Sequence, residues 1–453
     1  NTPSTETAAA GALTCAIGSL AENTEYAFVL RTLDAAGNVS EGISFHLTTA
    51  KLSTPKTYYF IYTATDLDNV RNGPLYDYIV MADIDLSDYA AGAGFEPIGG
   101  SPSSTTTSFA GAKFLGSFDG NGFTISNLKI NRPSEYYVGL FAFVDTYTSV
   151  STYLPGTVKN LTLESDGVAG KGYVGTLAGY SGGSAINCAV SVTLPADVTG
   201  TDAYTGGVVG KTYTGSASGS SFTGTVIGTS YVGGFAGQND TGPMSACSAS
   251  GSVTGSGDYV GGLVGGNSNW SSDPEQSRLT DCTTAATVTA GGDYAGGLAG
   301  QSTTSSITGC HATGNISASG SGSYMGGLIG SGSGSVEGCS AAGGVQGAGW
   351  YFGGLIGTGS GPFENCQASG NVTVSGSGRY TGGFIGYGGE LSDCHATGAG
   401  TGVYYTGGLA GYASGNTSNC SATGDVSGQG TVNITYTGGL AGYIAGSTSD
   451  CYA

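Results

Sequence analysis

The amino-acid sequence predicts an all-β protein, a right-handed parallel β-helix preceded by part of a β-sandwich. Three observations support this fold class. A glycine-rich unit recurs ten times in tandem, none of its segments has a helical period, and the chain combines 87 glycines with 28 tyrosines and 15 phenylalanines. Units of this size bury a continuous core only when they stack on one another.

The first half of each unit is a Tyr-x-Gly-Gly segment, as in Tyr259-Val-Gly-Gly-Leu-Val-Gly265. The second half contains a cysteine, as in Ile307-Thr-Gly-Cys310. We interpret one unit as three short strands separated by Gly, Ser and Asn turns, which together form one coil. Because coils stack at about 4.8 Å, ten of them predict a rod of about 50 Å. A propeller is the alternative, but its blades usually need about 40 residues or more.

The repeated tyrosines lie 25 to 36 residues apart, and Tyr137 belongs to a degenerate first copy. Stacked coils would align them in a column that faces either solvent, where rings could bind sugars, or the interior, where they would pack. We favour the structural role. The ten members of this tyrosine column are Tyr173, Tyr204, Tyr231, Tyr259, Tyr294, Tyr324, Tyr351, Tyr380, Tyr405 and Tyr436.

Nine of the ten cysteines occupy one repeat position, and Ser220 stands there in the unit that lacks a cysteine. We interpret them as a column of small buried side chains. Disulfides between adjacent coils are the alternative, although parallel Cβ vectors make that geometry poor. A metal column is disfavoured because no histidine or carboxylate recurs alongside. The members of this cysteine column are Cys188, Cys247, Cys282, Cys310, Cys339, Cys366, Cys394, Cys420 and Cys451.

The Gly-Leu-x-Gly core with its following Asn-Cys turn resembles the GLUG repeat over residues 137–453. This motif occurs in large bacterial surface proteins, including adhesin-like proteins and non-catalytic regions of some IgA-peptidase precursors. The resemblance implies a repeat rod at a microbial surface, but it implies no particular activity, because a fold does not determine function.

Residues 51–136 are expected to cap the rod and form its first coils. Ala64–Arg71 reads as a short capping helix with Thr65 or Asp66 as N-cap. Residues 78–86 read as one strand, and 118–125 as strand, Gly turn, strand. Residues 1–50 resemble the second half of a fibronectin type III domain, an Ig-like sandwich, because the Leu20 and Tyr26 spacing matches a tyrosine corner. We expect the chain to be a portion of something larger.

Composition restricts the partners. The chain carries 12 Lys and Arg against 31 Asp and Glu, a net charge of −19. This charge disfavours nucleic acid, whose phosphates need cations, and anionic membranes. The sequence contains no run of about 18 apolar residues, so it predicts no membrane span. The sequence therefore predicts an extracellular or cell-surface protein that is not inserted in a membrane.

Candidate catalytic groups are few. His311 and His395 follow column cysteines three units apart, and His46 lies in another domain, so no triad assembles. Asp83, Asp85 and Asp88 could hold calcium or act as an acid/base pair, but we interpret them as turn and strand-edge carboxylates.

We therefore predict no enzyme, no cofactor, no metal and no catalytic residue. The predicted function is a structural or adhesive surface protein, which could be a subunit of a self-associating extracellular filament. A carbohydrate-binding module using the aromatic column and a polysaccharide-acting β-helix enzyme remain as alternatives.

Overall fold

The computed structural model describes residues 25–31, 36–41, 43–48, 57–99, 109, 111–148, 153–269, 276–376, 378–430 and 435–453. The chain divides into two units, residues 1–57 and residues 58–453. In the first unit β1 (Glu25–Leu30) pairs antiparallel with β2 (Ile43–Thr48). The remainder of the predicted fibronectin type III-like segment falls largely outside the described residues, and that assignment stays a prediction.

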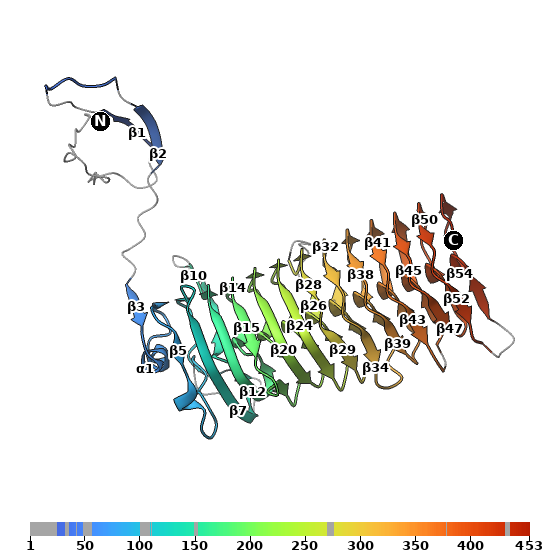
Figure 1. The fold of residues 1–453 in the computed structure, drawn as a ribbon, viewed down its shortest axis with the longest axis horizontal. Helices are drawn as coiled ribbons and strands as arrows, with labels where there is room; N and C mark the ends of the chain where they lie inside the picture. The colour runs from blue at the N-terminus through green and yellow to red at the C-terminus, as the bar shows by residue number, and fades with distance from the viewer. Residues whose placement is uncertain are drawn as a thin grey trace. The chain divides into compact units, whose positions relative to one another are not determined.

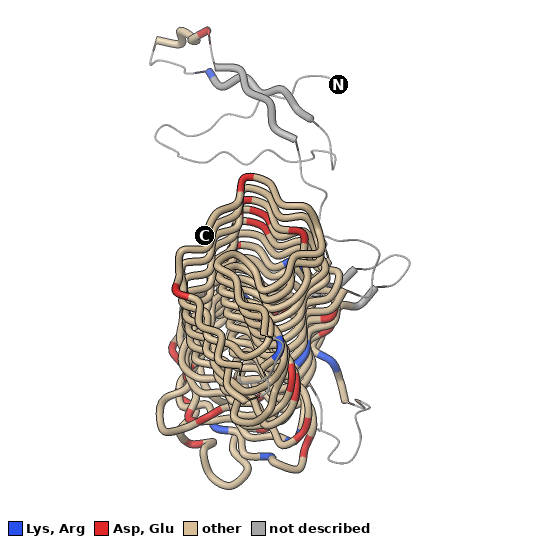
Figure 2. The backbone as a smooth tube through the Cα atoms, turned by 90° about the vertical axis from the view of Figure 1, so that its right-hand side faces the viewer, with Lys and Arg blue, Asp and Glu red and all other residues tan. Residues whose placement is uncertain are grey.

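The second unit is a parallel β-solenoid of about ten turns, which confirms the predicted β-helix (Figure 1). Every described strand pair from β3 (Tyr58–Ile61) onward is parallel except the β9–β10 hairpin (Thr146–Thr148 and Tyr153–Pro155). Figure 2, which looks along the solenoid, shows successive turns lying over one another. Such in-register stacking satisfies the backbone of each turn by hydrogen bonds to the turns on either side.

The solenoid begins with β3, a short helix and β4 (Asp77–Val80), which pairs with β3. Helix α1 (Ala64–Asp68) continues into the 3-10 helix η1 (Asn69–Asn72). Its N-cap is Thr63, and not Thr65 or Asp66 as predicted. Asp66 is the third helical residue, where its carboxylate accepts from the Thr63 N–H while Thr63 Oγ1 accepts from the Asp66 N–H, a capping box.

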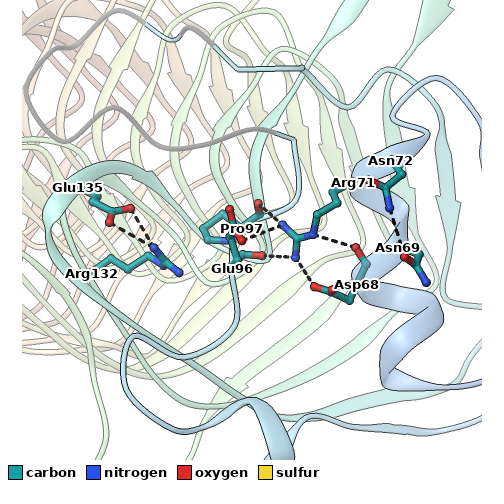
Figure 3. A network of polar contacts seen from close by, with 8 residues as sticks. All are labelled: Asp68, Asn69, Arg71, Asn72, Glu96, Pro97, Arg132 and Glu135. Carbon is teal, nitrogen blue, oxygen red and sulfur yellow. Dashed lines mark hydrogen bonds and ion pairs between the residues drawn. The ribbon is translucent and has the colours of Figure 1, made fainter.

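Arg71 holds this helical segment against the next loop (Figure 3). Its Nε donates to the carbonyl oxygen of Asp68 (2.9 Å) and its Nη2 to that of Glu96 (3.0 Å). The guanidinium also pairs with the Asp68 carboxylate and lies 5.6 Å from the ring centroid of Phe95. A planar five-donor group can satisfy carbonyls on two segments at once, so Arg71 links the start of the solenoid to its first turn.

The strand predicted over residues 78–86 is two strands, β4 and β5 (Ile84–Asp85), and η2 (Ser87–Tyr89) follows. The segment predicted as strand, turn, strand is β6 (Ser117–Asp119) and the start of β7 (Thr124–Val138). These two strands belong to different sheets, so the glycine turn between them is a corner of the solenoid and not a hairpin.

A typical turn contains five short strands instead of the predicted three. From Tyr324 to Trp350 these are β35 (Met325–Gly326), β36 (Ile329–Gly332), β37 (Val336–Glu337), β38 (Ser340–Ala341) and β39 (Val345–Gly347). Strands of the β36 and β37 type form one long sheet, and the other three types form the second sheet. Glycines and residues of positive φ at the corners interrupt the predicted strands.

The interior between the sheets is one continuous apolar cluster that runs from Ile61 to Ala422. Columns of aliphatic and phenylalanine side chains fill it, and Phe235, Leu263, Leu298, Leu328 and Leu355 form one such column at the Gly-Gly-Leu position. Side chains alternate in direction along a strand, so each turn contributes inward apolar residues and outward polar ones.

The residue before the column position, which holds a cysteine in nine turns, Leu161 in one and Ser220 in another, has a left-handed backbone. Its φ lies between 49° and 63° in eleven successive turns. Asparagine, aspartate and glycine adopt this conformation at low cost, which explains the recurring Asn-Cys, Asp-Cys and Gly-Cys pairs. The residues at this corner are Asn160, Asn187, Gly219, Ala246, Asp281, Gly309, Gly338, Asn365, Asp393, Asn419 and Asp450.

Ala246 is the exception at this corner, with φ 50° and no side-chain amide to support it. We expect Ala246→Gly to raise the free energy of unfolding by about 1 kcal/mol, because the left-handed region costs an alanine about 1–2 kcal/mol. The matched control is Ala249→Gly, in the interior of β24 (Ser248–Gly255), where the same change should be destabilising. Urea unfolding of the three proteins measures this, and an unchanged or lower midpoint for Ala246→Gly would contradict the strain.

Candidate functional site: the cysteine and tyrosine columns

The structure places the nine cysteines in one column along the solenoid. All carry free thiols, and all but Cys451 are buried, with 0–1% of each residue exposed. No disulfide joins these nine cysteines, so the structure does not support the disulfide alternative. Each cysteine directly follows the left-handed corner, which turns the chain so that the next side chain points inward.

Hydrogen bonds favour cysteine over a larger apolar residue at this position in the turns from Cys188 onward. The sulfur of Cys310 lies 3.5 Å from the carbonyl oxygens of Thr308 in its own turn and Leu279 in the preceding turn, so the thiol can donate to either. The backbone N–H of Cys310 donates to the sulfur of Cys339 (3.3 Å), one turn further. The same N–H to sulfur contact recurs from Cys339 to Cys366, Cys394 to Cys420 and Cys420 to Cys451.

Ser220 reproduces this pattern with oxygen in place of sulfur. Its hydroxyl lies 3.1 Å from the carbonyl oxygen of Ser218 and 3.4 Å from that of Ala185, and it accepts from the Cys188 N–H at 3.0 Å. From Cys188 onward this position therefore holds a small side chain that can both donate and accept, whereas Leu161 fills it in the turn before.

Burial should make the column thiols unreactive. At most 1% of eight of the nine column cysteines is exposed, so a reagent cannot reach their sulfur atoms. At Cys188 burial also raises the pKa to about 11, which disfavours the thiolate that attacks alkylating reagents. At pH 8 we expect iodoacetamide to modify at most two cysteines of the folded protein, the half-buried Cys451 and Cys15, which lies outside the described residues. In guanidinium chloride all ten should react. Peptide mapping by mass spectrometry gives the count, and rapid modification of Cys282 or Cys310 in the folded protein would refute the buried column.

The tyrosine column is continuous from Tyr137 to Tyr436. Successive ring centroids lie 4.5 to 5.2 Å apart and successive ring planes differ by at most 29°. Rings lying edge to edge in one plane could not approach so closely, so the rings are offset and overlap face to face. Except at the exposed Tyr436, the rings are half-buried or buried, and burial together with neighbouring rings raises the pKa of Tyr231 to about 12.

Each column tyrosine lies at a corner of the solenoid, and the side chains of the residues just before some of these tyrosines stabilise that corner by hydrogen bonds. Asp258 Oδ1 accepts from the Asp293 N–H (2.8 Å), and Asp293 Oδ1 accepts from the Ser323 N–H (2.7 Å). Both bonds cross from one turn to the next. They support a backbone in which Tyr259, Tyr294 and Tyr324 have φ between 62° and 66°, which is unusual for an aromatic residue.

A second stack lies beside the first at its C-terminal end. Tyr387, Tyr412 and Tyr443 follow one another at 4.9 Å between ring centroids. The ring planes of Tyr387 and Tyr412 stand at 69° to 87° to neighbouring rings of the tyrosine column. The two stacks form a herringbone. In such packing most ring faces are covered by neighbouring rings, so the column offers ring edges and hydroxyls, and not open faces, to a ligand.

A buried polar row runs inside four turns, and the sequence analysis did not identify it. Asn239 Nδ2 donates to Asn267 Oδ1 (2.7 Å), and Asn267 Nδ2 donates to Ser302 Oγ (3.1 Å). Thr212 Oγ1 donates to Asn239. Lys211 pairs with the neighbouring Asp240, Nζ to Oδ2 at 2.9 Å. Each member of the row lies two residues after the last glycine of a Tyr-x-Gly-Gly-x-x-Gly segment. This recurring polar position is the sequence pattern that could have revealed the row.

The remaining candidates do not come together. His311 Nδ1 contacts Ser340 Oγ (2.8 Å) and His395 Nδ1 contacts Ser421 Oγ (2.9 Å), three turns apart in one outward column. The side chain of His46 is outside the described set. Within the described ranges no group of three or more His, Cys, Asp or Glu residues could hold a metal, and no helix is long and apolar enough to cross a membrane.

Two of the three aspartates accept hydrogen bonds from the backbone. Asp83 Oδ1 accepts from the Thr124 N–H (2.9 Å), and Asp85 Oδ1 accepts from the Ser87 N–H (2.8 Å) and from Asn127 Nδ2 (2.7 Å). The hydrogen bond from Asn127 is the main cause that lowers the pKa of Asp85. Asp88 lies exposed in η2.

These features define a repeat solenoid with a buried cysteine column and a partly buried tyrosine column, and a known repeat motif matches parts of it. Four segments match the GLUG motif: residues 228–254, 256–289, 291–317 and 402–427. All four lie inside the predicted repeat region.

Two curated proteins resemble parts of the chain. Halomucin of Haloquadratum walsbyi is 36% identical over 171 residues, which are 36% of this chain and 2% of that protein. A protein of Evansella cellulosilytica described as a Gly-rich membrane protein is 35% identical over 146 residues, 31% of this chain and 15% of its own length. The matched residues thus span a small part of both relatives.

Two solved structures are also similar. One is a Bacteroides ovatus protein described as an immunoglobulin A1 protease, with 18% identity, a TM-score of 0.37, and coverage of 72% of this chain and 78% of that one. The other is an IgA1 protease with 12% identity, a TM-score of 0.33, and coverage of 83% and 24%.

Proposed function

We propose that the chain is a cell-surface rod, a structural and adhesive repeat protein that holds outward-facing loops away from a microbial cell. The observation that carries this proposal is the unbroken register of the tyrosine column over eleven turns. Backbone pairing and ring stacking connect adjacent turns on the outside, and a continuous apolar core connects them inside. The solenoid should therefore resist bending between adjacent turns. Similarity to halomucin and to a Gly-rich membrane protein supports the surface location.

Surface labelling tests the location. Antibodies against residues 137–453 should label intact cells of the source organism, and brief protease treatment of those cells should release solenoid peptides. An antibody against a cytoplasmic protein, which should label only permeabilised cells, is the control. Labelling that requires permeabilisation would overturn the proposal.

Electron microscopy of native material tests the mechanical role. Isolated short rods support a stalk, and filaments with a repeat of one rod length support the predicted self-association. Compact particles without a rod would refute both. The prediction that the chain is not an enzyme is tested separately with polyuronates, where cleavage lost on Asp83→Ala would contradict it.

A further inference from the structure

One column of residues runs along the sheet that contains β36 and β37, and its residue types change along the solenoid. The strand pairings define its members turn by turn. They are aromatic at both ends and polar or glycine in the middle, and they are short at Ser331 and Thr358, just before Tyr387. Its members are Phe143, Tyr180, Lys211, Gln238, Gly266, Gln301, Ser331, Thr358, Tyr387, Tyr412 and Tyr443. Tyr387 is therefore the first ring of the second stack, and small side chains precede it.

A groove of about 270 Å³ lies where the short residues meet Tyr387. It crosses β31 (Ala299–Thr303), β36, β41 (Ile356–Glu364) and β45 (Ile385–Ser392), which pair in that order. Three steps of about 4.8 Å give it a length of about 14 Å, enough for two or three sugar rings in a row.

The lining is hydroxyl-rich and carries no charge. Ser331, Ser333, Thr358, Ser360 and Ser414 line the groove with hydroxyl side chains, and Tyr387 supplies its aromatic ring. Thr358, Ser302 and Ser333 already use theirs in bonds with Tyr387, Asn267 and Thr304. Within the described residues, the hydroxyl groups of Ser331 and of the exposed Ser360 form no hydrogen bond, so they are available to a ligand.

We propose that this groove binds a neutral oligosaccharide, with one sugar ring against Tyr387 and its hydroxyl groups bonded to Ser331 and Ser360. The apolar C–H face of a sugar packs on an aromatic ring, while serine hydroxyls can donate to and accept from its edge. A polyuronate would find no Lys or Arg in the lining to pair with its carboxylates. The tyrosine column itself lacks open faces for this purpose. The inference supplies a ligand class for the adhesive part of the proposed function.

Saturation-transfer NMR and calorimetry with the purified chain test the groove, with maltotriose, cellotriose and chitotriose as neutral probes and trigalacturonate as the charged one. At least one neutral trisaccharide should bind. Tyr387→Ala and Ser331→Leu, which fills the groove, should each weaken binding at least tenfold. Tyr387→Phe should retain it, and so should Tyr213→Ala, which removes an exposed ring outside the groove. Urea midpoints identify any variant that loses binding through misfolding.

The inference would be overturned if no neutral probe bound, or if binding persisted in both Tyr387→Ala and Ser331→Leu. Preference for trigalacturonate would also contradict it. None of these outcomes affects the surface-labelling experiment. The inference that the groove binds carbohydrate can therefore be refuted without refuting the proposed surface location.

Discussion

Replacing Lys211 with methionine is expected to lower the free energy of unfolding by about 3 kcal/mol. Lys211 Nζ lies 2.9 Å from Asp240 Oδ2, and the two side chains are only 18% and 7% exposed. Lys211 also lies 4.8 Å from the ring centroid of Tyr204. Removing one partner of a buried ion pair leaves an uncompensated charge, which typically costs about 3–5 kcal/mol.

The second partner provides the test of this cause. In the double variant Lys211→Met and Asp240→Asn no charge remains buried, and the amide can still contact Gln238, whose Nε2 donates to Asp240 Oδ1 at 2.9 Å. We expect most of the lost stability to return. If the double variant is as unstable as the single one, packing of the lysine chain, and not the unpaired aspartate, causes the loss.

Lys113→Met is the matched control. Lys113 pairs with Asp145 at 2.6 Å, but its side chain is 42% exposed. Surface ion pairs contribute about 0–1 kcal/mol, so this variant should unfold close to the wild-type urea midpoint.

Substituting alanine for Gly326 is expected to be about as damaging, at about 3 kcal/mol. A Cβ there would lie 2.0 Å from the carbonyl oxygen of Ile329 and 2.8 Å from the backbone nitrogen of Gly357 in the next turn. Both neighbours are backbone atoms held in the hydrogen-bonded stack, so neither can move alone, and overpacking of this kind usually costs about 1–3 kcal/mol.

Gly332→Ala in the same turn is the control, because its Cβ would meet nothing closer than Ile329 Cγ2 at 3.6 Å. Urea unfolding compares the two. Equal midpoints would show that the solenoid can adjust at Gly326. The same close approach explains why the first residue of the repeated Gly-Gly pair is glycine. A Cβ added at Gly261 or Gly382 would lie 1.9 or 2.0 Å from a backbone oxygen.

The repeat unit, the all-β class and the parallel stacking could be predicted from sequence, because a period that recurs ten times leaves few ways to bury its apolar residues. The same period indicated that the cysteines align. The capping residue was predicted wrongly. Thr63, Thr65 and Asp66 are all plausible caps by residue type, and only the backbone geometry selects Thr63.

The features with functional consequences depended on neighbours in other turns. Lys211 and Asp240 contact each other across one turn, and Tyr387 bounds a groove because Thr358 and Ser331 precede it in the column. Turn lengths vary from 25 to 36 residues, so sequence spacing does not show which polar residues become neighbours.

By itself, the sequence determined that this chain forms stacked β turns with an apolar interior, a cysteine column and a tyrosine column. Its periodic glycines and apolar residues can satisfy backbone and core together only in that arrangement. The tertiary structure alone decided the split into two sheets, the covered faces of the tyrosine rings, the buried ion pair and the groove. Each of these depends on contacts between turns, which unequal loops separate in sequence and the strand register brings together.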